Sequence, residues 1–322
     1  MDRPPRPART LLTSDGLLPL DAPFTLNDAQ ALGVSRQQLR SLLAAHSVRR
    51  VVRGVYAAAQ APDDVFFRAA ALARVLPADA VATDRTAAWL HGVDLLPRSS
   101  RETTPPLQVF RPPGRRARRT GVASGERALL PRDVVRVGTV RATSPVRTAL
   151  DLSRLVWRFD ALAALDQFVR SGVRIEELLT ELDRFRGYRG VVQARALVPL
   201  ADGRAESVAE SVLRLHWYDA GLPPPEPQSW VQDERGIERY RLDLALPDVR
   251  FAAEYDGAEF HSSTEQREHD LHRRRWLDEH AGWTVEVFVN DDLFRPFSDP
   301  APRLRDGLRR ARARLGHAPW TP

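Results

Sequence analysis

The pattern of hydrophobic and polar positions predicts two short helices and a β-ribbon near the N-terminus. Hydrophobic residues recur at helical spacing over 26–32 and stop at Gly33. A second helix begins at Ser35, because Ser35 and Gln38 have the spacing of a capping box and the leucines that follow share one side of a helix. Residues 48–56 are rich in Val and are interrupted by Arg and Gly, which is typical of the ribbon of a winged helix.

Further along, the pattern predicts a middle α/β domain over residues 61–200. Helical periodicity, as in 159–171, alternates there with short β-prone stretches. We predict single strands at Leu107–Arg111 and Val134–Val140, separated by a loop that contains the basic run 115–119.

Alternation with period two marks a β-hairpin in the last third of the chain. Residues 239–246 and 251–256 both alternate, and Pro247-Asp248-Val249-Arg250 is a turn between them. If the hairpin closes symmetrically on this turn, residue 243 pairs with residue 254. Three carboxylates then share one face of the hairpin: Asp243, Glu254 and Asp256.

Segments on either side of this hairpin supply further candidate groups. Glu206 and Glu210 lie one turn apart on a predicted helix, where like charges repel, so a partner for them is expected. After the hairpin, His261 can return over the carboxylate face as a general base or to orient a water. Asp270 and Arg273 have the spacing of an ion pair that braces the site.

Crowded carboxylates in a half-buried sheet are unfavourable unless a positive charge neutralises them. A hard divalent cation, Mg²⁺ or Mn²⁺, is the natural counter-ion, and water bound to it can become a nucleophile. We therefore expect Asp243, with Glu254 or Asp256, to hold the metal ion; in the nuclease hypothesis reached below, Glu210 completes the set of metal ligands.

Composition excludes several kinds of chemistry and divides the chain by charge. The 322 residues include no Cys and no Lys, which excludes disulfides, thiolate zinc sites and lysine-dependent catalysis. No apolar run is long enough to span a membrane and no signal segment begins the chain, so we expect a cytoplasmic location and no membrane partner. Residues 1–200 hold 31 Arg against 19 Asp and Glu (net +12), whereas residues 201–322 hold 17 against 23 (net −6).

The basic front half suits a polyanion, and a winged helix gives its arginines definite roles. The second helix would enter a major groove while the ribbon meets phosphates; the alternative is a small helical domain with a solvated basic face. The predicted DNA-binding residues are Arg36, Gln37 and Arg40 on the helix and Arg49, Arg50 and Arg53 on the ribbon.

Residues 24–56 resemble the N-terminal portion of AbiEi-type antitoxin proteins, and Thr86–Gly92 and Thr143–Leu152 resemble their middle portion. The resemblance implies a winged helix that binds promoter DNA and represses a toxin–antitoxin operon. It also raises the expectation of a toxin partner, whose identity the sequence does not give.

Residues 204–290 resemble the PD-(D/E)XK nuclease superfamily, and among its members the very-short-patch-repair-endonuclease-like proteins. The motif is Arg-Leu-Asp-Leu, then Glu-Tyr-Asp-Gly followed by a His, after a helix with Glu. The resemblance implies a mixed sheet flanked by helices and Mg²⁺-dependent cleavage of DNA. The roles it implies are Glu210 as the helix carboxylate, Asp243 as the principal metal ligand, Glu254 or Asp256 as the second acidic group, and His261 as base or leaving-group stabiliser.

Two features depart from that superfamily. Its lysine is absent because Asp256 stands at that position, and the structural zinc of the repair enzymes is excluded by the lack of Cys. Mismatch-specific repair therefore does not carry over.

Together these patterns predict an α/β multidomain protein. Its expected parts are a disordered tail (1–20), a winged helix-turn-helix domain (21–60), an AbiEi-like α/β domain (61–200) and an endonuclease-like domain (201–322). The leading hypothesis is a metal-dependent DNA endonuclease. The alternative is a non-enzymatic DNA-binding regulator or antitoxin with a degenerate nuclease fold. The sequence leaves open RNA as a substrate, the target sequence and the oligomeric state.

Overall fold

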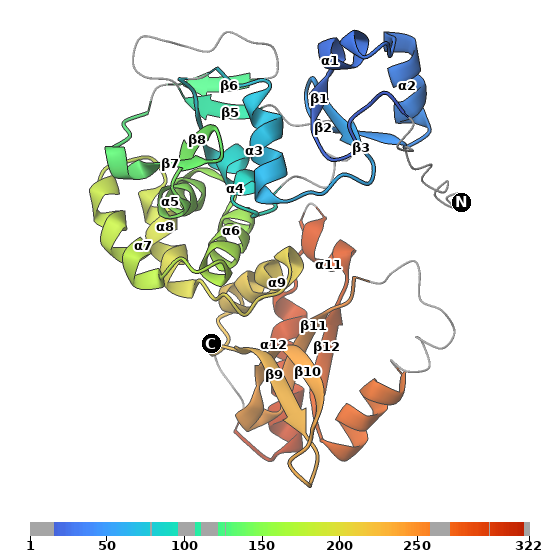
Figure 1. Cartoon of the computed structure of the whole chain (residues 1–322). Coiled ribbons are helices and arrows are strands. Elements are labelled where there is room, and N and C mark those ends of the chain that lie inside the picture. Colours follow the sequence, from blue (N-terminus) through green and yellow to red (C-terminus); the bar gives the residue numbers. More distant parts are fainter. Residues whose placement is uncertain are drawn as a thin grey trace. The chain divides into compact units, whose positions relative to one another are not determined.

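The computed structural model describes residues 16–77, 79–95, 107–110, 122–125, 127–257, 271–295 and 297–318 (Figure 1). The chain forms two compact units, Met1–Leu152 and Ser153–Pro322. Both helices and sheets occur in the described parts of each unit, which confirms the mixed α/β class. None of the helices in these parts combines the length and apolar character needed to cross a bilayer.

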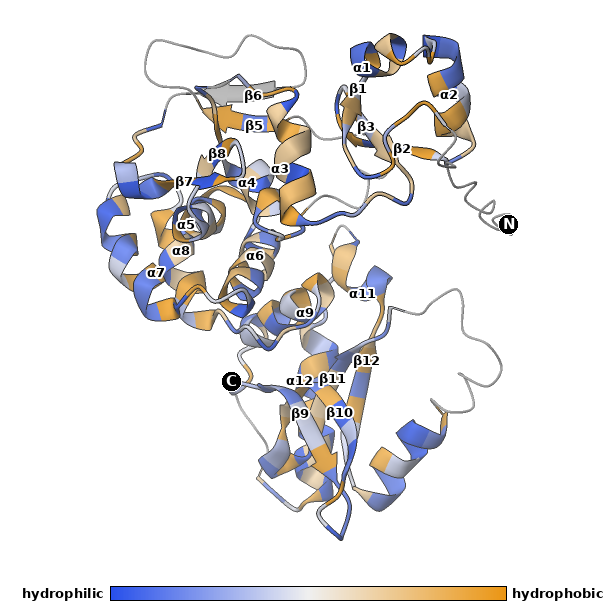
Figure 2. Cartoon of the chain, viewed as in Figure 1, coloured by the Kyte–Doolittle hydropathy of each residue, from blue (hydrophilic) through white to orange (hydrophobic). Residues whose placement is uncertain are grey.

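Unit 1 begins with a small antiparallel sheet of strand order β1-β3-β2. The predicted capping box at the start of the second helix is confirmed, since the Ser35 hydroxyl accepts the N–H of Gln38 (3.2 Å) and the Gln38 side chain accepts the N–H of Ser35 (2.7 Å). Leu39 of this helix is buried, whereas its polar residues are exposed. Figure 2 shows that α2 carries both hydrophilic and hydrophobic residues. The elements are β1 (Phe24–Thr25), α1 (Leu26–Ala31), α2 (Arg36–Ala44), β2 (Val48–Val52) and β3 (Val55–Ala58).

The remainder of unit 1 is built on a sheet of strand order β6-β5-β4-β8-β7. Its strands are β4 (Val81–Ala82), β5 (Leu107–Phe110), β6 (Val122–Gly125), β7 (Val134–Val137) and β8 (Val140–Thr143), with helices α3 (Val65–Ala73), α4 (Asp84–Leu90) and α5 (Pro145–Leu155). A short 3-10 turn, η2 (Pro131–Asp133), precedes β7.

The prediction of a single strand at Val134–Val140 is wrong. Val137 pairs with Val140, so the chain reverses through the two residues between them and forms an antiparallel hairpin. Gly138, with φ +56°, allows this tight reversal because it has no Cβ.

A buried network of charges holds the C-terminal part of unit 1 together. Arg147 on α5 donates to Asp151 (2.8 Å) and to Asp133 (2.7 Å). Arg127 donates to Asp151 and to Asp84 at the start of α4, both at 2.8 Å. Because the members are paired in a low-dielectric interior, removing one would leave another charge uncompensated.

Unit 2 opens with helices and short 3-10 turns. These are α6 (Arg158–Arg170), α7 (Ile175–Leu182), η3 (Asp183–Phe185), α8 (Val191–Leu197), η4 (Val198–Leu200) and α9 (Val208–Asp219). Helix α6 packs along α9, and an ion pair between Asp166 and Arg214 joins them at 2.6 Å. Both side chains of this pair are only 1% exposed.

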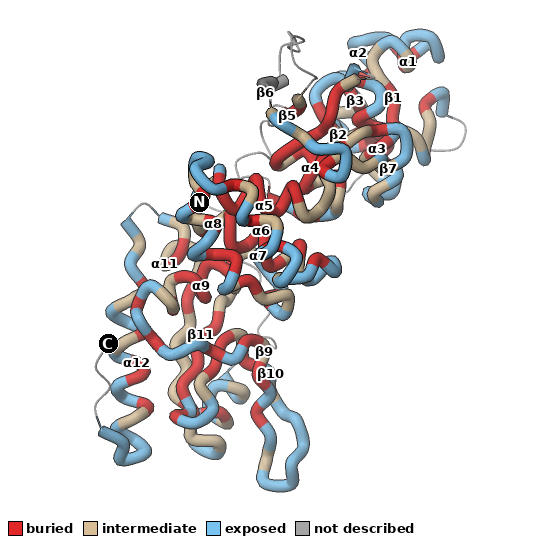
Figure 3. Tube along the Cα trace, turned by 90° about the vertical axis from the view of Figure 1, so that its left-hand side faces the viewer, coloured by how far each residue is buried: buried red, intermediate tan, exposed pale blue. Residues whose placement is uncertain are grey.

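The last part of unit 2 is a mixed sheet of order β12-β11-β10-β9. Strands β9 to β11 are antiparallel neighbours, whereas β12 runs parallel to β11. Helices α9 and α12 pack on it, and buried residues predominate in α9 and β11 (Figure 3). The elements are β9 (Glu226–Gln232), β10 (Glu238–Leu246), η5 (Pro247–Val249), β11 (Phe251–Tyr255), the π-helical turn η6 (Trp276–His280), β12 (Thr284–Phe288), α11 (Asn290–Phe294) and α12 (Ala301–Arg314).

The predicted hairpin register is confirmed. Leu244 pairs with Ala253 and Leu246 with Phe251, so residues 243 and 254 stand opposite each other at the next step. The turn η5 between these strands ends at Arg250, which adopts a left-handed conformation with φ +49°.

Candidate functional site

The first candidate surface is the exposed side of α2. Arg36, Gln37 and Arg40 are all exposed, while Leu39 points into the core and anchors the helix. The cap at Ser35 leaves the side chains of the first turn facing outward beside the positive end of the helix dipole.

The β2–β3 hairpin adds further arginines with different surroundings. Arg50 and Arg53 are exposed, and Arg50 lies over the ring of Tyr56 at 5.9 Å. Arg49 is half-buried: it donates to the carbonyls of Ala61 (3.2 Å) and Pro62 (3.1 Å). The DNA contacts expected of these arginines stay a prediction, and Arg49 has a structural role besides.

No acidic residue interrupts this basic segment. Residues 29–62 contain five Arg and neither Asp nor Glu. At its N-terminal border, Asp28 is bound to Thr25, whose backbone and side chain lower the pKa of the Asp28 carboxyl. Within this segment, the exposed arginines Arg36, Arg40, Arg50 and Arg53 therefore present positive charge to solvent.

The second candidate site is an acidic cluster in unit 2, formed by Glu210 of α9, Asp243 of β10 and Glu254 of β11. Burial raises the pKa of Asp243 to about 7, and the charges of Glu210 and Glu254 act in the same direction. A hydrogen bond from the N–H of Tyr255 to the Asp243 carboxylate (2.8 Å) and the charge of Arg273 oppose this rise. The influence of both glutamates on Asp243 indicates that these three carboxylates, distant in sequence, lie near one another.

Each of the two glutamates has partners within the chain. Both oxygens of Glu254, which is 8% exposed, accept hydrogen bonds from the Arg273 guanidinium, one of them at 2.8 Å. Glu210 accepts the side-chain amide of Gln228 (2.8 Å) and the N–H of Glu206 (2.7 Å).

Of the four other residues predicted for this site, the structure describes two, Asp256 and Arg273. Asp256 follows β11, and its carboxylate lies 3.4 Å from the Arg274 guanidinium. His261 and Asp270 fall outside the described residues. Arg273, predicted as a brace for the site, contacts the cluster directly through Glu254.

Sequence reasoning missed two residues at this site. Gln228 has φ +56° within strand β9, and its side-chain oxygen is buried without a hydrogen-bond partner in the described part of the chain. Arg241 is the partner that the Glu206–Glu210 repulsion led us to expect, and it contacts Glu206 at 2.7 Å. Arg241 could have been found from the sequence, because it lies two residues before Asp243 in the same strand. No local pattern marks Gln228.

As arranged, these carboxylates do not fit a divalent cation. Arg273 occupies both oxygens of Glu254, and within the described ranges no group of three or more Asp, Glu or His is arranged to hold a metal. The expectation of Mg²⁺ or Mn²⁺ therefore stays a prediction from the sequence pattern.

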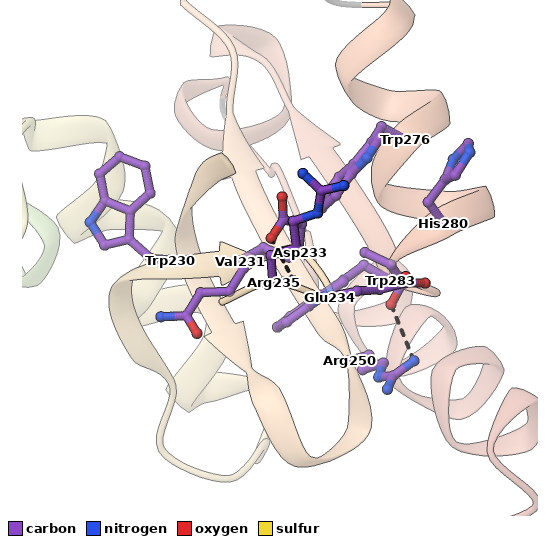
Figure 4. Close-up of a pocket in the computed structure, with 11 residues that line it drawn as sticks. Trp230, Val231, Asp233, Glu234, Arg235, Arg250, Trp276, His280 and Trp283 are labelled. Carbon is purple, nitrogen blue, oxygen red and sulfur yellow. Dashed lines mark hydrogen bonds between the residues drawn. The ribbon is translucent and has the colours of Figure 1, made fainter. Parts of the chain in front are cut away.

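A cavity of about 620 Å³ lies beside the β9–β10 hairpin and contains none of the predicted catalytic residues (Figure 4). Trp276 and Trp283 are on its wall, and Trp230 points away from them. Arg250 donates to the Ala281 carbonyl there (3.2 Å), so this guanidinium is held by the fold.

Comparison with known proteins places the middle of the chain in a recognised class. Residues 78–200 match the family model described as the AbiEi antitoxin C-terminal domain. This confirms the resemblance of the middle portion, which includes the network around Arg147 and Asp151.

Over nearly its whole length the chain is also similar to uncharacterised proteins of Mycobacterium tuberculosis. MT2308 of one strain and Rv2248 of another are each 39% identical to it over 280 residues, which is 87% of this chain and 99% of the relative. The chain belongs to the family of these mycobacterial proteins and contains an AbiEi antitoxin C-terminal domain.

Proposed function

We propose that this protein is a DNA-binding transcriptional regulator of the AbiEi antitoxin kind. The observation that carries the proposal is the exposed set Arg36, Gln37 and Arg40 in a segment free of acidic residues, in a chain that contains an AbiEi antitoxin domain. Uncompensated arginines on a rigid helix supply both nonspecific attraction to phosphate and directed contacts to bases.

In this proposal residues 21–60 form a winged helix. Two capped helices followed by a two-stranded hairpin have the required order, and α2 is the recognition helix. Arg36 or Arg40 would donate to guanine and Gln37 would pair with adenine in the major groove. Arg50 and Arg53, on the β2–β3 hairpin, would contact DNA phosphates. Because the matched family is described as an antitoxin, a toxin is the expected protein partner.

Binding of the protein to the DNA upstream of its own gene tests this proposal. We expect the double variant Arg36→Ala, Arg40→Ala to bind at least about thirtyfold more weakly, because each lost base contact costs about 1–3 kcal/mol. Fluorescence anisotropy at fixed salt measures the dissociation constants, since the affinity itself depends on salt.

The matched control is Arg174→Ala with Arg195→Ala, which removes the same charge from two exposed positions in unit 2. This control should keep the affinity within about twofold. Equal losses in both double variants would mean that overall charge, not α2, binds the DNA.

A second candidate function, the metal-dependent DNA endonuclease, has one observation in its favour: Glu210, Asp243 and Glu254 converge. Because Arg273 holds Glu254, this function requires that contact to open. If the hypothesis is correct, the protein nicks supercoiled plasmid with Mg²⁺ or Mn²⁺, and Asp243→Ala abolishes nicking. Nicking that survives in the Asp243→Ala protein would exclude the assigned site.

A further inference from the structure

The acidic cluster of unit 2 contains a cation supplied by the chain itself. Residues 271–275 are helical, and the Arg273 guanidinium projects from this helix onto Glu254 of β11. One of its nitrogens lies 2.8 Å from Glu254 Oε2 and the other contacts Glu254 Oε1, so the pair is bidentate. Such charge-assisted, two-pronged contacts are among the strongest hydrogen bonds in proteins.

Contacts on other sides hold this guanidinium in place. It donates to the carbonyl of Arg241 on β10 at 2.9 Å, and its carbon lies 5.7 Å from the centre of the Tyr240 ring. Arg273 thus bridges the two strands that carry Asp243 and Glu254. A guanidinium fixed to a carboxylate, a carbonyl and an aromatic ring is positioned by the fold, unlike a surface arginine.

The surrounding groups are consistent with a cluster that already has its positive charge. Glu206 is paired with Arg241 at 2.7 Å, and Glu210 is held by the Gln228 amide at 2.8 Å. A divalent cation needs carboxylate oxygens that are free to coordinate it. Here such a cation would have to displace a bidentate guanidinium from a largely buried glutamate.

We propose that Arg273 is the resident cation of the acidic cluster, and that the cluster takes a divalent metal ion only when this guanidinium is removed. The inference goes beyond the proposed regulator function, because it concerns unit 2 and holds whether or not α2 binds DNA. If the inference is correct, the intact protein binds neither Mg²⁺ nor Mn²⁺ at this site.

Titration of the full-length protein with Mn²⁺ tests the inference, with free Mn²⁺ measured by electron paramagnetic resonance. The unchanged protein should leave Mn²⁺ free. Arg273→Met removes the charge and keeps an aliphatic side chain, so this variant should bind one equivalent at least about tenfold more tightly than the unchanged protein. Adding Asp243→Asn to Arg273→Met should abolish that binding.

Arg274→Met is the matched control, because it removes the same charge from the next residue along the chain. The Arg274 side chain is exposed and contacts Asp256. This variant should bind no more Mn²⁺ than the unchanged protein. Equal binding by both methionine variants, or none by an Arg273→Met protein that circular dichroism shows to be folded, would overturn the inference.

The unchanged protein provides a test that does not depend on the folding of a variant. If it binds Mn²⁺ stoichiometrically and Asp243→Asn abolishes that binding, the cluster is a metal site despite Arg273 and the inference is wrong. If Mn²⁺ stays free, the first part of the inference, that the cluster takes no divalent metal ion while Arg273 is in place, is supported even where circular dichroism shows that Arg273→Met is unfolded.

Discussion

Asp243 shows how the surroundings of one residue set its charge. It is placed by β10 beside two glutamates, and its pKa of about 7 lies well above the ordinary value of 3.8, chiefly because of burial. At a pH between these two pKa values, this carboxyl is ionised in the unfolded chain and protonated in the folded protein. The contribution of Asp243 to stability therefore falls as the pH rises through this window, and the full penalty is present above it.

Asp243→Asn should accordingly stabilise the protein in an amount that grows with pH. Asn keeps an acceptor for the Tyr255 N–H and removes the charge. Thermal melts should show a gain of about 3 °C or more near pH 8 and almost none near pH 4. Asp256→Asn, which changes a half-buried carboxylate that contacts Arg274, is the control, and a gain independent of pH would contradict the argument.

At the scale of the element, α2 depends on how its first turn is closed. The reciprocal hydrogen bonds of Ser35 and Gln38 satisfy backbone N–H groups that have no partner inside the helix. In the proposed function this cap also fixes the backbone positions from which the Arg36 and Gln37 side chains project toward DNA.

Removing the cap with Ser35→Ala should lower the free energy of unfolding by about 1 kcal/mol. Chemical denaturation of the two proteins measures the difference. Ser41→Ala is a suitable comparison, because Ser41 lies within the same helix and donates to the Gln37 carbonyl at 3.3 Å, so its loss should change stability by less than about 0.5 kcal/mol. If both substitutions lower the free energy of unfolding equally, the Ser35 cap does not contribute more to stability than another serine of the helix.

At the scale of the whole molecule, buried ion pairs join elements that the chain separates widely. Asp166 and Arg214 lie 48 residues apart and connect α6, inside the matched AbiEi domain, to α9, which carries Glu210. This pair ties a helix before residue 200 to one that helps to form the acidic cluster.

Asp166→Ala should destabilise unit 2 by about 3–5 kcal/mol, because it leaves Arg214 buried without its carboxylate. The double variant Asp166→Leu, Arg214→Met should recover most of this loss, since no unpaired charge remains. Denaturation curves followed by circular dichroism measure both. A cost below about 1 kcal/mol for Asp166→Ala would mean that the pair does not hold the helices together.

Features governed by neighbouring residues were predictable from the sequence. The hairpin register that sets Asp243 opposite Glu254 followed from alternation and a short turn, and the α2 cap followed from a serine three residues before a glutamine. The β7–β8 hairpin was missed because the glycine and threonine at its reversal lie inside a β-prone stretch rich in Val.

The charge state of the acidic cluster was beyond such local reasoning. Local patterns establish that carboxylates gather in this region, since register and helix periodicity depend on residues a few positions apart. Which cation neutralises them depends on where the helix that carries Arg273 lies, 19 residues beyond Glu254, and on packing that places the Gln228 amide against Glu210. Such placements arise from many contacts acting together, so only the folded chain reveals that the cluster contains an arginine where the sequence pattern suggested a metal.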